Sequence, residues 1–201
     1  MMIVMRTRMG NARAAAKDAT HERIVAVAAR AIRRSGYDGT GVAYIMKEAG
    51  LTHGAFYAHF ASREAMLAEA AGSAFAQAAA ALAGIAARVP PDQALASMLE
   101  AYLSKEHVAH VATGCPLAAL GSETSRQTPD VRRVATRYVK EMIDLVARQL
   151  PDWGQPGAHQ RALVTVSTMV GALLLARAVD DSGLSDSLRE AALGHLTTSV
   201  R

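Results

Sequence analysis

Apolar side chains recur every three or four residues through most of the chain, a spacing that predicts helices rather than strands. In the segment DATHERIVAVAARAIRRSG, which starts at Asp18, they line one face of a helix. Gly36 stands where a glycine commonly ends a helix. A second, short helix is predicted from a cap at Thr40 to Ala49, and a third from a cap at Thr52. The first third of the chain therefore predicts three helices joined by tight turns.

The rest of the chain shows the same helical spacing. Ser62 is expected to cap a long helix, which Pro90 and Pro91 stop. The spacing of apolar residues over 92–110 predicts one amphipathic helical segment. A break that contains a short apolar turn follows it. Further helices are predicted at 130–150, 158–179 and 185–200. The predicted fold class is therefore all-α, with about nine helices and no convincing strand.

Two short helices flank Gly50, and this is the layout of a helix-turn-helix. In that layout the second helix enters the DNA major groove. Gly54 is small, so the backbone can approach DNA, and the free N–H groups at the helix start favour a phosphate. Phe56 and Phe60, four residues apart, are expected to face the core. The other faces then carry side chains that can donate hydrogen bonds: Thr52, His53, Tyr57 and His59. The same layout also occurs in helical proteins that never touch DNA.

Positive charge gathers at the start of the chain. Residues 1–66 hold ten Lys and Arg against five Asp and Glu, whereas the rest holds twelve against thirteen. A basic head on a near-neutral body favours a polyanionic partner. We expect a basic flexible arm at 1–17, a helix-turn-helix domain at 18–64, and a ligand-binding and dimerisation domain at 65–201.

Composition excludes several classes of protein. No run of about 18 uncharged apolar residues is present, so we expect no membrane span. The order of apolar and basic residues at the start is the reverse of a signal peptide's, and a single cysteine suits the cytoplasm. The chain has no phosphate-binding glycine loop, no nucleophile elbow and no carboxylate pair with a histidine. We therefore expect a cytoplasmic protein that is not an enzyme and uses no cofactor.

Two alternatives concern the middle of the body. His107 and His110 are three residues apart with Cys115 close behind, which is one way to bind a soft metal. No second ligand pair is present, so no metal site is predicted. Cys115 precedes Pro116 at the expected start of a short helix, where a thiolate is favoured. A thiol-based redox sensor therefore stays open, although a lone cysteine among apolar residues is more often inert.

The head closely resembles a known family. The stretch RIVAVAARAIRRSGYDGTGVAYIMKEAGLTHGAFYAHFASREAML, about 45 residues without a gap, is similar to the DNA-binding domain of the TetR family of transcriptional repressors. The segments GCPLAALGSE and TPDVRRVATRYVKEMIDLV resemble a recurring subtype of the family's helical body. The resemblance implies an all-helical, homodimeric regulator that binds double-stranded DNA.

The resemblance also implies roles for individual residues. Thr40 would cap the second helix and touch a phosphate, and Arg63 would hold a phosphate at the start of the fourth helix. Gly41 stands where the family often has a serine, so a hydroxyl is missing there. Ala43 is too small to read bases well, and more of the DNA contact would therefore fall to Tyr44. The full set of predicted DNA-binding residues is Thr40, Gly41, Tyr44, Lys47, Thr52, His53, Gly54, Tyr57, His59 and Arg63.

The body is expected to hold the dimer interface and an effector site. The helix that enters the major groove, the recognition helix, is short and buries too little surface against DNA for tight binding. Two such helices, one from each subunit, are therefore needed on a palindromic operator. The helices near 158–179 and 185–200 are candidates for the interface between subunits, although 158–179 is also typical of a helix central to its own core. A largely apolar small molecule is expected against Met98, Tyr102, His107, Met142, Leu145, Trp153 and Met169.

The predicted function is therefore a sequence-specific transcriptional regulator, a repressor released from its operator by a small-molecule effector. The alternative of a different class is a helical ligand-binding or scaffold protein whose head makes protein contacts. Salt dependence distinguishes the two, because DNA affinity falls by roughly 0.9 log units per phosphate contact for each log unit of salt.

Overall fold

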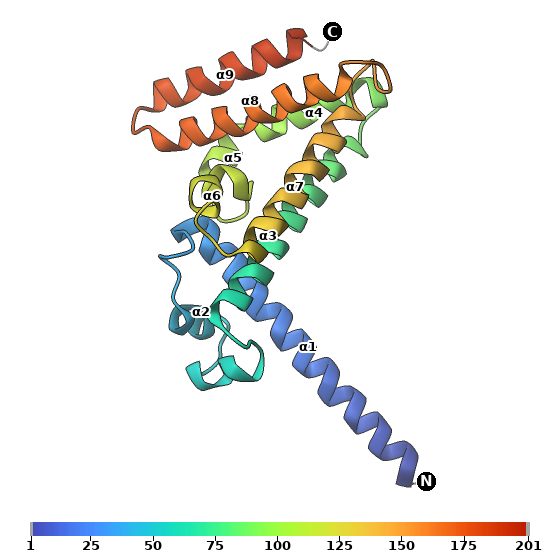
Figure 1. The fold of residues 1–201 in the computed structure, drawn as a ribbon, viewed down its shortest axis with the longest axis vertical. Coiled ribbons are helices and arrows are strands. Elements are labelled where there is room, and N and C mark those ends of the chain that lie inside the picture. Colours follow the sequence, from blue (N-terminus) through green and yellow to red (C-terminus); the bar gives the residue numbers. More distant parts are fainter. Residues whose placement is uncertain (1, 200–201) are drawn as a thin grey trace.

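The computed structural model describes the backbone of residues 2–199 and the side chains of residues 14–198. Over these residues the chain forms nine α-helices and one 3-10 helix and no strand (Figure 1). The all-α prediction is confirmed. The elements are α1 (Met2–Ser35), α2 (Val42–Glu48), η1 (His53–Ala58), α3 (Arg63–Ala86), α4 (Pro91–Tyr102), α5 (Lys105–Ala109), α6 (Pro116–Thr124), α7 (Pro129–Ala147), α8 (Ala158–Ala178) and α9 (Ser182–Ser199).

The first helix is longer than the sequence pattern predicts. The segment expected to be a flexible arm is helical from Met2 onward and continues into α1. Its alanines, methionines and arginines are good helix formers, which favours a helix even where apolar periodicity is absent. In Figure 1 this half of α1 extends beyond the other helices. The arm's Arg6, Arg8 and Arg13 fall outside the residues whose side chains are described.

The head is a small core built from α1, α2, η1 and the start of α3. Ile24, Ile32 and Met46 are fully buried in it, and Phe56 and Phe60 close it from the side of η1. The start of α3 is capped as predicted, because the Ser62 hydroxyl accepts a hydrogen bond from the backbone N–H of Ala65 at 3.1 Å. The helix α3 then continues into the body, so one rigid element joins the two parts.

The body is a bundle in which α3 packs on α7, and α7 on α8, with α9 lying against α8 (Figure 1). The predicted single segment at 92–110 is wrong. It is divided into α4 and α5 because Leu103 leaves the helical geometry and the Ser104 side chain caps a new helix by accepting from His107 N–H. Within the segment predicted as a break with a short apolar turn, residues Pro116–Thr124 form a regular helix, α6, and Cys115 precedes it as expected.

Two helices, α3 and α8, are long and apolar enough to cross a membrane by length and composition alone. Such helices are also typical of the interior of soluble helical proteins. Both pack along their length on other helices of the bundle, α3 on α1, α4 and α7, and α8 on α7 and α9. Their apolar character is accounted for in part by this packing.

Candidate functional site

The turn between α2 and η1 has the predicted geometry. Gly50 adopts a left-handed conformation with φ of +70°, which a residue with a side chain rarely takes. The N–H of Leu51 then donates to the Met46 carbonyl at 2.8 Å. Phe56 and Phe60 are almost fully buried and stack with ring centroids 5.5 Å apart. These contacts set the orientation of η1 against the head, although its hydrogen bonding is that of a 3-10 helix.

One face of η1 is open to solvent. Tyr57 is 73% exposed, which is high for a large aromatic side chain, and it meets the buried Phe56 edge-on at 5.3 Å. Gly54 is exposed, and a methyl group placed on it would meet nothing within 4 Å. Nothing in the described fold therefore requires a glycine at this position. Other predicted residues exposed on α2 and η1 are Tyr44, Lys47, Thr52 and His53.

Thr40 does not have the predicted position. Gly41 is the residue that precedes α2, and Thr40 lies one residue earlier, only 1% exposed. Its hydroxyl donates to the Gly36 carbonyl at 2.8 Å, so it ties the loop back to the end of α1. The predicted cap is therefore wrong, because the hydroxyl finds its partner in the preceding turn rather than in α2. Gly41 itself is exposed.

Arg63 is half-buried beside the same loop. Its guanidinium donates to the backbone carbonyls of Tyr37 and Thr40. Part of its hydrogen-bonding capacity is thus used to hold the loop between α1 and α2. The structure gives Arg63 a positioning role that its place at the start of α3 did not reveal.

Arg34, which the sequence reasoning missed, lies beside Tyr44. Its guanidinium donates to the Tyr44 hydroxyl and sits 5.7 Å from the centre of the ring. Both side chains are exposed, on the same side of the head. Arg33, the residue before Arg34, is buried and bonds to Gln77 of α3 and to the Gly114 carbonyl. Only the tertiary packing around α1 therefore distinguishes the two adjacent arginines.

His59 points toward α1. Its ring lies 5.9 Å from that of His21, whose Nε2 donates a 2.6 Å hydrogen bond to the Glu69 carboxylate on α3. The Nδ1 atom of His59 is buried, and the pKa of this histidine is lowered by desolvation, by His21 and by Lys17. Of the predicted DNA-binding residues, Thr40 is thus buried, and His59 and Arg63 are half-buried.

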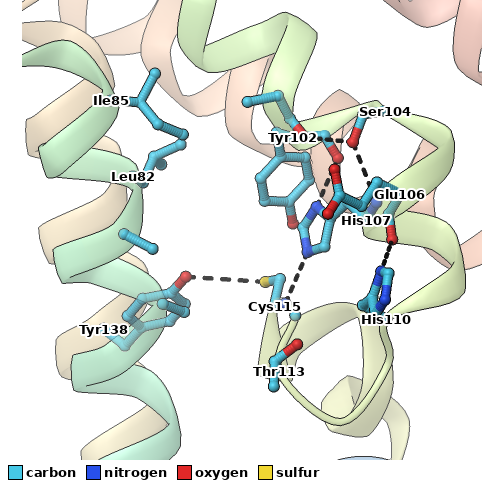
Figure 2. A pocket seen from close by; sticks show the side chains of 14 residues that line it. Leu82, Ile85, Tyr102, Ser104, Glu106, His107, His110, Thr113, Cys115 and Tyr138 are labelled. Atoms are coloured by element: carbon cyan, nitrogen blue, oxygen red, sulfur yellow. Dashed lines mark hydrogen bonds between the residues drawn. The ribbon is translucent and has the colours of Figure 1, made fainter. Parts of the chain in front are cut away.

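The body contains a cavity of about 450 Å³ between α3, α4, α7 and the segment from α5 to α6 (Figure 2). Figure 2 shows Leu82, Ile85 and Tyr138 on one side, with Tyr102, His107 and Cys115 facing them. Its size is within the usual range for small-molecule sites. The complete lining is Ala78, Ala81, Leu82, Ile85, Ala101, Tyr102, Ser104, Glu106, His107, His110, Thr113, Gly114, Cys115 and Tyr138.

Of the seven predicted ligand-contacting residues, Tyr102 and His107 line this cavity. Trp153 lies in the turn before α8 and is 53% exposed. The other four do not line the cavity: Met98, Met142 and Met169 are buried in the core of the body, and Leu145 is half-buried against it. Helical spacing identifies buried side chains, but it does not distinguish those beside a cavity from those packed on one another.

The tautomer of His107 follows from its two partners. Its Nδ1 donates to the Tyr102 carbonyl at 2.7 Å, and its Nε2 accepts from the N–H of Cys115 at 2.9 Å. The ring is therefore neutral, and desolvation lowers its pKa, with a smaller contribution from Arg177. Both ring nitrogens are occupied by these bonds. Within residues 14–198 no group of three or more His, Cys, Asp and Glu side chains is arranged to hold a metal ion.

Cys115 and two tyrosines form the polar end of the cavity. The Cys115 sulfur is buried and lies 3.8 Å from the Tyr138 hydroxyl. Burial, and then the neighbouring Cys115 sulfur, raise the pKa of both Tyr102 and Tyr138. The two phenols are therefore neutral hydroxyl groups that can donate hydrogen bonds to a bound molecule.

Comparison with known proteins covers both parts of the chain. Residues 24–70 match the bacterial regulatory proteins of the tetR family, and residues 91–192 match the LmrA/YxaF-like C-terminal domain of transcriptional regulators. The chain is 30% identical to the "Uncharacterized HTH-type transcriptional regulator Rv0196" of Mycobacterium tuberculosis over 169 residues, which cover 78% of this chain and 83% of the relative.

Solved structures are similar over nearly the whole chain. A TetR transcriptional regulator from Chloroflexus aurantiacus is 25% identical, with a TM-score of 0.76, over 90% of this chain and 94% of that one. The reduced form of NemR from Escherichia coli shares the fold at 21% identity and a TM-score of 0.75, over 89% of this chain and 95% of that one. The head with its helix-turn-helix and the matched helical body together identify the chain as a member of the TetR family of transcriptional regulators.

Proposed function

We propose that the protein is a cytoplasmic repressor that binds a palindromic operator as a homodimer and is released when a small molecule occupies the cavity of the body. The observation that carries this proposal is the open face of η1. It presents Tyr57 and an uncrowded Gly54 on a helix that two buried phenylalanines hold in place.

The contacts with DNA are proposed for the exposed residues of the head. Thr52, His53 and Tyr57 would meet bases or phosphates in the major groove, and Lys47 would add positive charge. Arg34 and Tyr44 form an exposed pair on α1 and α2 that suits a phosphate. Thr40 and Arg63 act indirectly in this proposal, because their hydrogen bonds hold the loop before α2.

The proposed dimer interface is formed by α8 and α9. One face of α8 is buried in the protomer, with Met169 and Leu173 fully inside. The opposite face is also apolar but exposed, and so is the start of α9. The large exposed side chains there are Leu163, Val164, Leu174, Leu175 and Leu184. A contiguous apolar face of this kind favours an intersubunit four-helix bundle, since single protomers rarely leave one open.

The proposed release mechanism connects the cavity to the head through α3. This helix lines the cavity with Leu82 and Ile85, and its first residue, Arg63, holds the loop before α2. A ligand that wedges α3 away from α4 would therefore tilt the head. Changing the spacing of two recognition helices lowers affinity for a palindrome whose half-sites are one helical turn apart.

The test is binding of the purified protein to the DNA that flanks its own gene, measured across a salt series with random DNA as control. We expect tight binding to the flanking DNA, a palindromic footprint, and affinity that falls steeply with salt. Tyr57→Ala should weaken this binding by about tenfold or more, as expected for loss of an exposed anchoring side chain. Equal, weak binding to both DNAs would contradict the assignment of an operator at this locus.

The matched control is Trp153→Ala. Trp153 is also a large exposed aromatic, at 53%, but it lies in the body before α8. It should leave DNA binding unchanged. If both substitutions weaken binding equally, or if Tyr57→Ala dissociates the dimer, then Tyr57 acts through the fold and not through contact with DNA.

The alternative in which Cys115 is a redox sensor receives partial support. Cys115 is the residue directly before α6, as expected, and its sulfur faces the cavity. It is only 2% exposed, so an oxidant would have to enter the cavity to reach it. Peroxide treatment that releases the wild-type protein from DNA, but not Cys115→Ser, would favour this alternative over release by a bound ligand.

A further inference from the structure

Two arginines without an acidic partner lie beside the turn at Gly114 and Cys115. These two turn residues line the cavity, whereas the arginines themselves do not. Arg33, on α1, is 2% exposed, and Arg177, on α8, is half-buried. They approach the turn at Gly114 and Cys115 from different helices. Arg33 Nη1 reaches the Gly114 carbonyl at 3.4 Å, and Arg177 donates to the carbonyls of His107 and Val108.

Every partner of these two guanidinium groups is neutral. Arg33 also donates to the Ala29 carbonyl and to the Gln77 side-chain oxygen, each at 3.0 Å. Arg177 keeps one buried nitrogen, Nη1, with no hydrogen-bond partner. Among the side chains described between residues 14 and 198, no carboxylate lies within 4.0 Å of either arginine. Buried charges are normally paired, so this arrangement leaves two positive charges uncompensated.

The remaining polar groups at this end are hydrogen-bond donors. The Tyr102 hydroxyl is buried and lacks a hydrogen-bond partner among the described residues, although Tyr102 lines the cavity. Arg33 bonds to the Gly114 carbonyl and Arg177 to the His107 carbonyl, so both guanidinium groups lie next to the segment that carries Cys115 into the lining. A carboxylate that accepts from Tyr102 beside Cys115 would therefore lie close to two positive charges. The only acidic residue of the lining, Glu106, is exposed.

The opposite wall of the cavity is apolar. Ala78, Ala81, Leu82 and Ile85 of α3 line it, and no charged side chain of α3 does. Figure 2 shows Leu82 and Ile85 across the cavity from Tyr102 and Cys115. The site therefore offers an apolar surface to one part of a ligand. To another part it offers hydrogen-bond donors that lie close to two positively charged arginines.

We propose that the cavity binds an organic carboxylate, with its apolar body against α3 and its carboxylate accepting a hydrogen bond from Tyr102 in the field of Arg33 and Arg177. The inference rests on the proposed function only in naming this ligand as the effector. Binding itself requires neither DNA nor an operator. Gly114 is part of the site, since a methyl group there would lie 2.6 Å from Arg177 Nη2 and 2.8 Å from the His107 ring.

The experiment is calorimetric titration of the full-length protein with two carboxylates, decanoate and 2-naphthoate, each paired with its uncharged amide of the same shape. We expect at least one carboxylate to bind at least about tenfold more tightly than its amide, as for a charge-assisted hydrogen bond in a desolvated site. Equal binding of acid and amide, or binding of none of the four at millimolar concentration, overturns the proposal.

Substitutions distinguish a loss of ligand contacts from a loss of folding. Tyr102→Phe removes only the hydroxyl and should weaken carboxylate binding severalfold, with a smaller effect on the amide. Tyr37→Phe is the matched control, because Tyr37 is a fully buried tyrosine outside the cavity. Arg177→Gln should reduce the preference for acid over amide, with a circular dichroism melt to verify folding. An unchanged preference in both Tyr102→Phe and a folded Arg177→Gln also overturns the proposal.

Failure of the proposed function would look different. If the carboxylate binds with this preference but leaves operator binding unchanged, the site stands and ligand-induced release is refuted. If the protein binds no operator at all, the titrations are unaffected. DNA release and carboxylate preference are thus independent readouts.

Discussion

The described fold does not require a glycine at position 54. It is exposed, its φ is not in the left-handed region, and an added methyl group would meet nothing within 4 Å. Glycine lowers helix stability relative to alanine, so the fold alone would favour a larger residue here. We attribute its presence to the close approach of DNA.

The corresponding prediction concerns Gly54→Ala. We expect the variant to be as stable as the wild type or more stable by ~0.4–1 kcal/mol, because alanine restricts the unfolded chain. Its affinity for the operator should nevertheless fall by about tenfold, or ~1.4 kcal/mol. Thermal unfolding and DNA titration measure the two effects. Gly84→Ala, at an equally uncrowded position on α3, should leave DNA affinity unchanged, and unchanged affinity in Gly54→Ala would refute the role of the glycine.

At the scale of elements, His107 joins three helices. It lies on α5, and its ring bridges the carbonyl at the end of α4 to the N–H of Cys115 before α6. This bridge requires the neutral ring, because a protonated Nε2 cannot accept a hydrogen bond. The turn that carries Cys115 therefore depends on the protonation state of one histidine.

This dependence predicts a pH effect on stability. The pKa of His107 is lowered in the folded protein, so the unfolded chain binds the proton first as the pH falls below about 6.5. Its contribution to the free energy of unfolding is present above that pH and is lost below it. In chemical denaturation at pH 7.5 and 5.5, His107→Gln should lose less stability between the two values than the wild type does.

The exposed His110, on the same segment, supplies the control for this measurement. His110→Gln should keep the wild-type pH dependence. The half-buried His59, whose pKa is also lowered, contributes equally to all three proteins and cancels. The same pH dependence in His107→Gln and wild type would show that the bridge tolerates protonation.

At the scale of the whole molecule, the exposed apolar face of α8 is the feature that a single protomer leaves unexplained. Leu175 and Val164 are about half exposed on the side of α8 that faces away from the protomer core. A charge placed there would be tolerated in the monomer but buried without a partner in the proposed dimer.

We therefore predict that Leu175→Glu yields a folded monomer. Sedimentation or light scattering should show a dimer for the wild type, with dissociation shifted by at least about tenfold in the variant. Operator binding should fall with it, because one recognition helix is too small for tight binding. The control is Trp153→Glu, because Trp153 is about as exposed as Leu175 but lies in the turn before α8. This variant should remain dimeric. If the Leu175→Glu variant remains dimeric, the dimer interface does not include this face of α8.

Much of the fold was predictable because it depends on neighbours in the sequence. Gly36 and Gly50 have the expected left-handed conformations, and Ser62 caps α3. The errors have equally local causes. Thr40 bonds to the preceding turn instead of α2, and the basic start of α1 is helical without any apolar stripe. In both cases two local solutions compete, and the pattern of residues does not show which is lower in free energy.

The candidate sites divide in the same way. The exposed face of the recognition helix follows from a period of three to four residues and from the two phenylalanines that face inward. The lining of the cavity does not follow from helical spacing. Of the seven residues predicted to contact a ligand, only Tyr102 and His107 line it. Met98, Met142 and Met169 have the same burial and the same spacing as lining residues, but they pack on other side chains instead of beside the cavity.

The sequence by itself determined the all-helical fold class, the helix-turn-helix head and the family, because periodicity, caps and turn glycines act within a few residues. Only the tertiary structure brought Arg33 of α1 and Arg177 of α8 to the same turn, whose Gly114 and Cys115 line a cavity with an apolar wall on α3. Whether a buried charge has a partner depends on every helix that packs around it. That is a property of the assembled bundle, in which solvent is excluded and residues far apart in the chain become neighbours.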